Sequence, residues 1–379
     1  MKHLLFIFSV FYLLSCGKKT EKPAESNQLT FSIDTVMIDS KGEFLFLNWG
    51  LSTACISMDG KVLYNFNIQE PSLETIDLDN LELIEKKAFD KEGPDGVGNN
   101  GKGGIVHLGD DKILFKGWPA PKIFNSKGEK SLDFENLSTI KTEATEKGKD
   151  FMYEAVLPTK TQYVFGIINE FPGKDFEFGK INLLDSTLKS FPLPTWEKLA
   201  DFTITFDDGN TYDILGPYIY VENVNQQIIV SSNVSSELYV YKPDKDSLYR
   251  YTYSYNLTKS GKTGIYATEI SDPEQFHNIY KGIYSEVSFL SPIWDHDNQQ
   301  YYRIHYESLF EDEYSGMYPK RLGSKVFISV YDKDLQLVGE VQLPQFPDIP
   351  GFHFAKDGKI WMFKNINDEM GFVRLSFIP

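Results

Sequence analysis

The sequence predicts an all-β fold organised as a six-bladed β-propeller. Short runs of aromatic and β-branched residues recur along the chain, separated by Gly and Asp turns, which is typical of antiparallel hairpins. Aromatic residues make up 15% of the 379 residues, and 28 Gly and 18 Pro supply turns. No long stretch has the apolar period of an amphipathic helix, so short helices are expected only near 141–150, 196–202 and 272–280.

The repeating unit is clearest at residues 40–68. Strands are expected at 43–47, 54–58 and 61–66, with the tight turn Asp59-Gly60 between the last two. A meander of this kind cannot cover both of its faces alone, so it must stack on copies of itself.

Each copy is expected to begin with one hairpin and to continue with a second. The first turns centre near residues 41, 110, 160, 224, 297 and 357, and the second turns lie at 59–60, 127–128, 185–186, 244–246 and 332–334. Two hairpins make a four-stranded sheet, and six such sheets make a propeller.

The sixth unit ends with a third strand at 371–377. A strand at 29–33 is therefore expected to supply the fourth and close the ring. The alternative is a β-sandwich followed by a small second β domain, although no break in composition separates two such parts.

The first residues have the features of an export signal. Residues 1–15 combine a positive start with an apolar run of about eleven residues, too short to span a bilayer, which takes about 20. Leu13-Leu-Ser-Cys16 resembles the lipobox of bacterial lipoproteins, which implies that Cys16 becomes the lipidated first residue of the mature chain. The alternative is an ordinary signal peptide with an incidental cysteine. Residues 16–28 are expected to be a flexible tether and 29–379 the propeller.

The lipobox, the tether and six irregular blades with Asp-Gly and Lys-Gly hairpins together resemble a known group of proteins. These are the lipoproteins of unknown function of the Bacteroidetes type, with TolB-like or NHL-like six-bladed propellers. The segment Glu92-Gly-Pro-Asp-Gly96 is similar to their Gly-Pro-Gly loops. The resemblance implies a fold, a membrane-anchored location and no catalytic residues that could be transferred.

Charge and motif content argue against several function classes. A net charge of −16 does not suit a phosphate backbone, so nucleic acid is not an expected partner. The Gly-rich loop at 93–104 fits two phosphate-binding patterns, but a strand follows it at 105–108 where those motifs need a helix, so no nucleotide is expected. Paired acids in turns lack the other ligands of a calcium loop, and no local zinc motif is present, so neither metal nor cofactor is expected.

Aromatic residues in loops are the main functional signal. Trp49 and Trp118 each lie just past an expected second strand, and such loops emerge together on one face of a propeller. Aromatic rings amid carboxylates suit sugars, whose C–H faces stack on indole. The candidate ligand-binding residues are Trp49, Trp118, Phe171, Phe310, Glu311, Asp312, Glu313, Tyr314 and Tyr318. The alternative is that the Trp residues pack between blades as core.

Two functions remain open from the sequence. The favoured one is a non-enzymatic lipoprotein of a Gram-negative outer membrane, whose loop face binds a glycan, a peptide or a partner protein. The other is an enzyme, such as a metal-assisted hydrolase, lyase or lactonase, with residues gathered around the central channel. An enzyme should show acids and His clustered at the channel mouth, and a binding protein should show an open aromatic groove.

Overall fold

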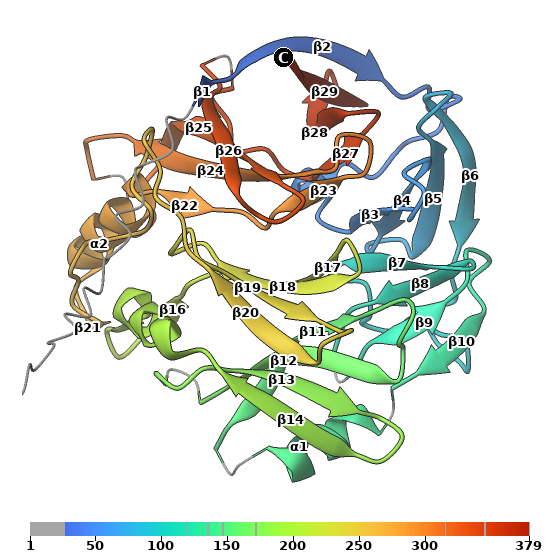
Figure 1. The fold of residues 1–379 in the computed structure, drawn as a ribbon, viewed down its shortest axis with the longest axis horizontal. Helices are drawn as coiled ribbons and strands as arrows, with labels where there is room; N and C mark the ends of the chain where they lie inside the picture. The colour runs from blue at the N-terminus through green and yellow to red at the C-terminus, as the bar shows by residue number, and fades with distance from the viewer. Residues whose placement is uncertain are drawn as a thin grey trace, which may run out of the picture.

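The computed structural model describes residues 27–378, apart from residues 119, 135, 146, 147, 171, 172, 315 and 345. The described residues form antiparallel sheets that follow one another about a common centre, in a propeller-like arrangement (Figure 1). The predicted all-β class is confirmed. The expected signal peptide at 1–15, Cys16 and most of the expected tether lie outside the described residues.

Four sheets are built from consecutive strands. Sheet 1 contains β3 (Ala54–Ile56), β4 (Val62–Asn67), β5 (Ser72–Asp77) and β6 (Glu82–Ala88). Sheet 2 contains β7 (Ile105–Gly109), β8 (Lys112–Phe115), β9 (Lys122–Phe124) and β10 (Lys130–Asp133). Sheet 3 contains β11 (Asp150–Val156), β12 (Tyr163–Asn169), β13 (Glu177–Asn182) and β14 (Thr187–Pro192). Sheet 4 contains β17 (Ile219–Val224), β18 (Gln227–Ser232), β19 (Leu238–Lys242) and β20 (Ser247–Tyr251).

The last two sheets each take a strand from the beginning of the described chain. Sheet 5 contains β22 (Ser288–Phe289), β23 (Ile293–Asp295), β24 (Gln300–Phe310), β25 (Arg321–Asp332) and β26 (Leu337–Gln342), and β1 (Asn27–Gln28) lies parallel to β26. Sheet 6 contains β27 (His353–Lys356), β28 (Lys359–Ile366) and β29 (Glu369–Ile378). The strand β2 (Thr30–Met37) pairs with β29 in antiparallel register, from Thr30 opposite Ile378 to Met37 opposite Gly371. The expected N-terminal strand is thus present and longer than 29–33.

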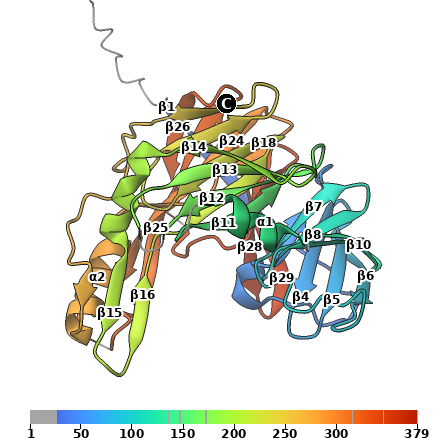
Figure 2. The same cartoon turned by 90° about the horizontal axis from the view of Figure 1, so that it is seen from below.

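A lobe built from the connections before and after sheet 4 was not expected. It holds the 3-10 segment η2 (Pro194–Phe202), a three-stranded sheet of β15 (Ile204–Asp207), β16 (Tyr212–Leu215) and β21 (Glu269–Ile270), and the helix α2 (Pro273–Ser285). Figure 2 shows α2, β15 and β16 projecting from one end of the molecule, with β1 at the other end. Of the three expected short helices, 196–202 and 272–280 correspond to η2 and α2. The helix expected at 141–150 is instead α1 (Leu137–Ala144), and β11 already begins at Asp150.

The alternating strand directions give the sheets two distinct faces. Connections between first and second strands, and between third and fourth strands, leave at one face, called here the turn face. Connections between second and third strands, and from one sheet to the next, leave at the other, called here the loop face. The lobe lies in two sheet-to-sheet connections, from sheet 3 to sheet 4 and from sheet 4 to sheet 5, and therefore belongs to the loop face.

The expected strand at 43–47 is wrong. The backbone N–H of Phe46 donates to both carboxylate oxygens of buried Glu74 (2.9 and 3.2 Å), and the Asn65 side-chain amide donates to the Phe46 carbonyl (2.7 Å). These side-chain bonds satisfy the backbone without a strand partner. Sheet 1 therefore begins at β3, the turn Asp59-Gly60 joins its first two strands, and the expected hairpin at residue 41 does not exist. The other five first turns are confirmed.

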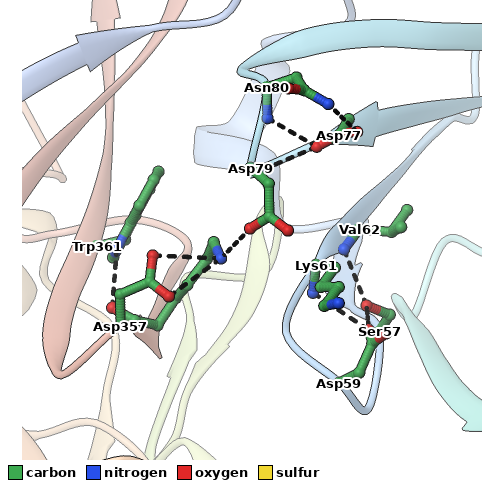
Figure 3. Close-up of polar contacts among 10 residues, drawn as sticks. Ser57, Asp59, Lys61, Val62, Asp77, Asp79, Asn80, Asp357 and Trp361 are labelled. Carbon is green, nitrogen blue, oxygen red and sulfur yellow. Dashed lines mark hydrogen bonds and ion pairs between the residues drawn. The ribbon is translucent and has the colours of Figure 1, made fainter.

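Apolar side chains fill the seams between neighbouring sheets. Leu63 and Ile76 of sheet 1 share one cluster with Trp361 and Phe372 of sheet 6, so the last sheet packs on the first. On the turn face the same seam carries an ion pair, in which Lys356 Nζ lies 2.5 Å from Asp79 Oδ1 and 3.3 Å from Asp357 (Figure 3).

Candidate functional site

A cavity of about 450 Å³ opens among sheets 2, 3 and 4, and it is called here the Trp118 pocket. It is lined by Gly103, Lys116, Gly117 and Trp118 beside sheet 2, by Lys141 of α1, by Phe151, Met152, Tyr153 and Glu154 of β11, and by Ile219, Tyr220, Val221 and Glu222 of β17. Its volume lies within the usual range of small-molecule sites.

Trp118 presents its ring to solvent at the rim of this pocket. Its side chain is 82% exposed, although full burial of an indole would be favourable by a few kcal/mol, about 25 cal/mol per Å² of apolar surface. The segment before it is held by the Gly-rich loop, since the Lys116 carbonyl accepts from the N–H groups of Gly101 (2.7 Å) and Gly103 (3.3 Å). A side chain at Gly117 would collide with Asn100, because a Cβ there would lie 2.7 Å from it. The Gly-rich loop therefore supports Trp118, and it leads directly into β7, as expected.

Tyr153 enters the same pocket from a strained position in β11. Its φ of 61° is unusual for a bulky residue, and the pairing of β11 with β12 shifts register between Met152 and Ala155. The side chain is half-buried, and burial raises the pKa of its phenol. Bulges and strained residues of this kind concentrate at functional sites, where they redirect a side chain.

The charges in the pocket balance. Lys141 Nζ forms an ion pair with Glu154 Oε1 at 2.6 Å, with both side chains largely buried. Lys116 and Glu222 add one further charge of each sign, and within the part of the chain that the structure describes neither side chain makes a hydrogen bond or ion pair. The pocket thus offers free polar groups beside aromatic rings without favouring a strongly charged ligand.

Phe44 and Trp49 are exposed aromatic residues of the segment that leads into sheet 1, and together they are called here the aromatic platform. These side chains are 92% and 60% exposed, and the Trp49 ring meets the Phe46 ring edge-on, at 5.8 Å between centroids. Trp49, Gly50 and Leu51 have φ of 52°, 63° and 61°, so three consecutive residues are left-handed. Leu51 is fully buried and the Gly50 carbonyl accepts from Phe352 N–H (2.8 Å), which holds this turn in place.

The loop at 310–318 differs from expectation because it covers the lobe. Phe310 is buried against Tyr280, so it belongs to the core and cannot stack on a ligand. Lys281 Nζ donates to the Glu311 carbonyl (2.7 Å) and pairs with Asp312 (3.3 Å).

The tyrosines of this loop are half-exposed but engaged. The Tyr314 ring meets the edge of His277, and Tyr318 donates to Asp213 and packs against Tyr280. None of the expected residues from Phe310 to Tyr318, Glu313 included, lines the Trp118 pocket, whose carboxylates are Glu154 and Glu222. Phe171 lies outside the described residues.

In the part of the chain that the structure describes, metal-ligating side chains are dispersed and the cysteine thiol is buried. Among them, no three His, Cys, Asp or Glu side chains are grouped closely enough to hold a metal ion. Cys55 is buried, and burial raises the pKa of its thiol to about 12, so it is not a thiolate at neutral pH. No helix in the described part of the chain is both long and apolar enough to cross a membrane.

Comparison with known proteins places the chain beside one family. The family described as Domain of unknown function (DUF4221) matches residues 26–342. The crystal structure of a DUF4221 member from Bacteroides vulgatus is 16% identical, with a TM-score of 0.63, and the match covers 93% of this chain and 99% of that one. This similarity shows a shared fold.

Weaker similarities reach other proteins. A Bacteroides fragilis protein described as exported is 8% identical over 92% of this chain and 96% of its own, with a TM-score of 0.46. The WD40 domain of Pan2 from Neurospora crassa is 8% identical over 92% and 97%, with a TM-score of 0.38. No curated protein sequence matches the chain.

Proposed function

The chain belongs to the DUF4221 family, whose function is unknown, and we propose that it is a non-enzymatic binding module that takes a glycan in the Trp118 pocket. The observation that carries this proposal is the exposure of Trp118 at the rim of a cavity that also holds Tyr153 and the Glu222 carboxylate. An open indole face suits the C–H face of a sugar ring, and carboxylate and ammonium groups suit its hydroxyls.

We further propose that sheets 1 to 6 are the six blades of a β-propeller. Each contains at least four strands, which follow the order of the chain except that β1 joins sheet 5 and β2 completes sheet 6. The lobe sheet is formed by the connections before and after sheet 4. The shared apolar cluster and the Lys356–Asp79 pair between sheets 6 and 1 support closure, as does the pairing of β2 with β29. Closure would leave only short sheet edges exposed.

The proposed location is the outer membrane of a Gram-negative bacterium, with the chain held by a lipid on Cys16. The lipobox-like sequence Leu13-Leu-Ser-Cys16 supports this proposal. In that setting the ligand is a glycan of the cell envelope or of the surroundings, and neither nucleic acid nor nucleotide is a partner.

The proposal is tested by replacing Trp118 with Ala and screening both proteins against an array of neutral and acidic oligosaccharides, followed by calorimetry. Binding should fall at least tenfold in W118A, because the stacking surface is lost, while the melting temperature stays within a few degrees. The control is Leu184→Ala, which removes an equally exposed apolar side chain from the turn between β13 and β14. Equal binding by W118A and the wild type, or no glycan bound by either, would contradict the proposal. Shortening of the sugars would indicate an enzyme instead.

A further inference from the structure

We propose that the ligand is a neutral saccharide chain long enough to contact the aromatic platform of Phe44 and Trp49 as well as the Trp118 pocket. This inference rests on the proposed function and adds a second subsite, so that the protein recognises a polymer rather than a single sugar.

The backbone at Trp49 is the first reason. Trp49 and Leu51 both lie in the left-handed region, which is costly for residues with a side chain, and Gly50 between them lies there too. Buried Leu51 and the Phe352 N–H bond to Gly50 fix the turn. Burial of Leu51 thus holds the turn while Trp49 stays exposed. A conformation of this cost that displays a large aromatic ring is typical of a binding site.

Continuity with the pocket is the second reason. The platform loop and the Gly-rich loop touch, since Ser52 O lies 3.4 Å from the position that a Cβ on Gly104 would take. Gly104 O in turn accepts from Lys116 N–H (3.0 Å), two residues before Trp118. Both aromatic sites therefore lie on adjoining loops of sheets 1 and 2, on the same face. A chain-like ligand can run from one to the other without leaving this face.

The chemistry of the two sites favours a neutral sugar chain as the single occupant. The platform presents apolar ring faces, and the Lys86 ammonium near it is already engaged by the Phe44 carbonyl (2.7 Å) and by Glu74 (3.6 Å). The pocket balances two ammonium groups with two carboxylates. Uncharged pyranose rings, with apolar faces and hydroxyl rims, match both sites.

The test uses linear neutral gluco-, manno- and xylo-oligosaccharides of two to eight units with the full-length mature protein, measured by calorimetry. Affinity should rise with chain length in the series that binds. W49A should lower affinity for the longest chains by about three- to tenfold and leave the shortest unchanged, whereas W118A should weaken every length. Phe44→Ala should act like W49A, and Leu184→Ala should change nothing.

The outcomes separate the two proposals. If short chains bind in a Trp118-dependent manner, but length and Trp49 have no effect, the second subsite is wrong and the proposed function stands. If no oligosaccharide binds at any length, both are wrong. If W49A and F44A instead abolish self-association or capture of a peptide, with sugar binding unchanged, the platform serves a protein and the inference is overturned. Unfolding of W49A is recognised by its circular dichroism, and F44A then decides alone, since Phe44 is almost fully exposed.

Discussion

Arg303 and Lys262 are buried cations that bind mainly backbone carbonyls. Arg303 donates from Nε to Leu290 O (2.8 Å) and from Nη1 to Ser236 O (2.6 Å), which joins sheet 5 to the start of β19 in sheet 4. Lys262 donates to Ile283 O (2.6 Å) and Ser288 Oγ (2.8 Å) beside the C-terminal end of α2. These side chains satisfy carbonyls that neither a ladder nor a helix satisfies, so both are structural.

Lys262 makes stability depend on pH in a predictable direction. Burial lowers the pKa of its ammonium to about 7, with nearby Glu286 acting in the opposite sense, whereas the unfolded value is about 10.4. Between pH 7 and 9 the unfolded chain therefore binds more protons at this site than the folded one, and the free energy of unfolding rises with pH. Well below pH 7 Lys262 is protonated in both the folded and the unfolded state, so its contribution to the free energy of unfolding no longer changes with pH.

The corresponding experiment is urea unfolding at pH 7 and pH 9 for the wild type and Lys262→Met. We expect the wild-type midpoint to rise between the two values and the midpoint of K262M to rise much less. Arg374→Lys, which changes an ion pair with partly exposed Asp34, serves as the control and should keep the wild-type slope. Equal slopes in the wild type and K262M would show that Lys262 does not titrate in this range.

At the scale of single elements, the segment 43–47 shows where sequence periodicity fails. Its alternating apolar residues fit a strand, but nothing in that pattern reveals that a distant carboxylate, Glu74, accepts the Phe46 N–H. Burial raises the pKa of Glu74, and Asn65 and Lys86 offset that effect. The segment is thus held by the buried side chains of Glu74 and Asn65 rather than by a β-ladder.

Replacing Glu74 with Ala should release this segment. The Phe46 N–H and the Asn65 amide would lose their acceptor in a buried site, which costs about 1–3 kcal/mol in the free energy of unfolding. Hydrogen exchange should accelerate at 43–47 in E74A, while the amides of β4 and β5 stay protected. Glu74→Gln, which keeps an acceptor oxygen, should be intermediate. Uniformly faster exchange throughout sheet 1 would mean that Glu74 supports the whole sheet and not this segment.

The candidate site was predictable only in part, for a physical reason. Trp118 was predicted from its place after a second strand, and the structure puts it at the rim of a pocket, although its role is untested. Phe310 is the last residue of β24 and is covered by α2, and no local sequence pattern reveals that the lobe folds back over it.

Three further pocket residues escaped the sequence analysis because they lie within strands. Tyr153 and Glu154 in β11, and Glu222 in β17, look like ordinary alternation along a strand. Only the bulge of β11 and the meeting of three sheets turn them toward one cavity. Charged residues on first strands, which line the centre of such an arrangement, are the signal that could have found Glu154 and Glu222.

At the scale of the whole molecule, the hairpins were predictable because turn chemistry is local. Asp, Gly, Asn or Pro at the turns mark where strands reverse, and five of the six first turns are where the sequence placed them. The lobe was not predictable, because its sheet pairs β15 with β21 in parallel. These two strands are separated by more than fifty residues that include the whole of sheet 4. Contacts of such long range leave no periodic trace.

The position of the N-terminal strand bears on how the molecule would be presented at a membrane. The β28–β29 connection lies at the loop face, so Ile378 at the end of β29 lies at the turn face, and Thr30 opposite it does too. The described chain therefore enters the fold at the turn face, as Figure 2 also shows by the separation of β1 from α2. The Trp118 pocket and the aromatic platform lie on the other face.

If Cys16 carries the proposed lipid, the turn face should be nearer the membrane and the pocket should point away from it. The test places a fluorophore on Lys127→Cys, in the turn between β9 and β10, or on Asn99→Cys, in the Gly-rich loop. These exposed sites lie at opposite ends of the same sheet, and the native Cys55 is buried and should not react. In vesicles with headgroup-quenching lipids, the label at residue 127 should be quenched more than the label at 99.

Cys16→Ser should abolish both membrane retention and quenching. Retention of C16S would refute the lipid anchor, whereas stronger quenching at residue 99 in an anchored protein would refute the orientation alone. A pocket facing away from its own membrane is open to long, water-soluble glycans, which are the ligands that two aromatic subsites on adjoining loops are suited to hold.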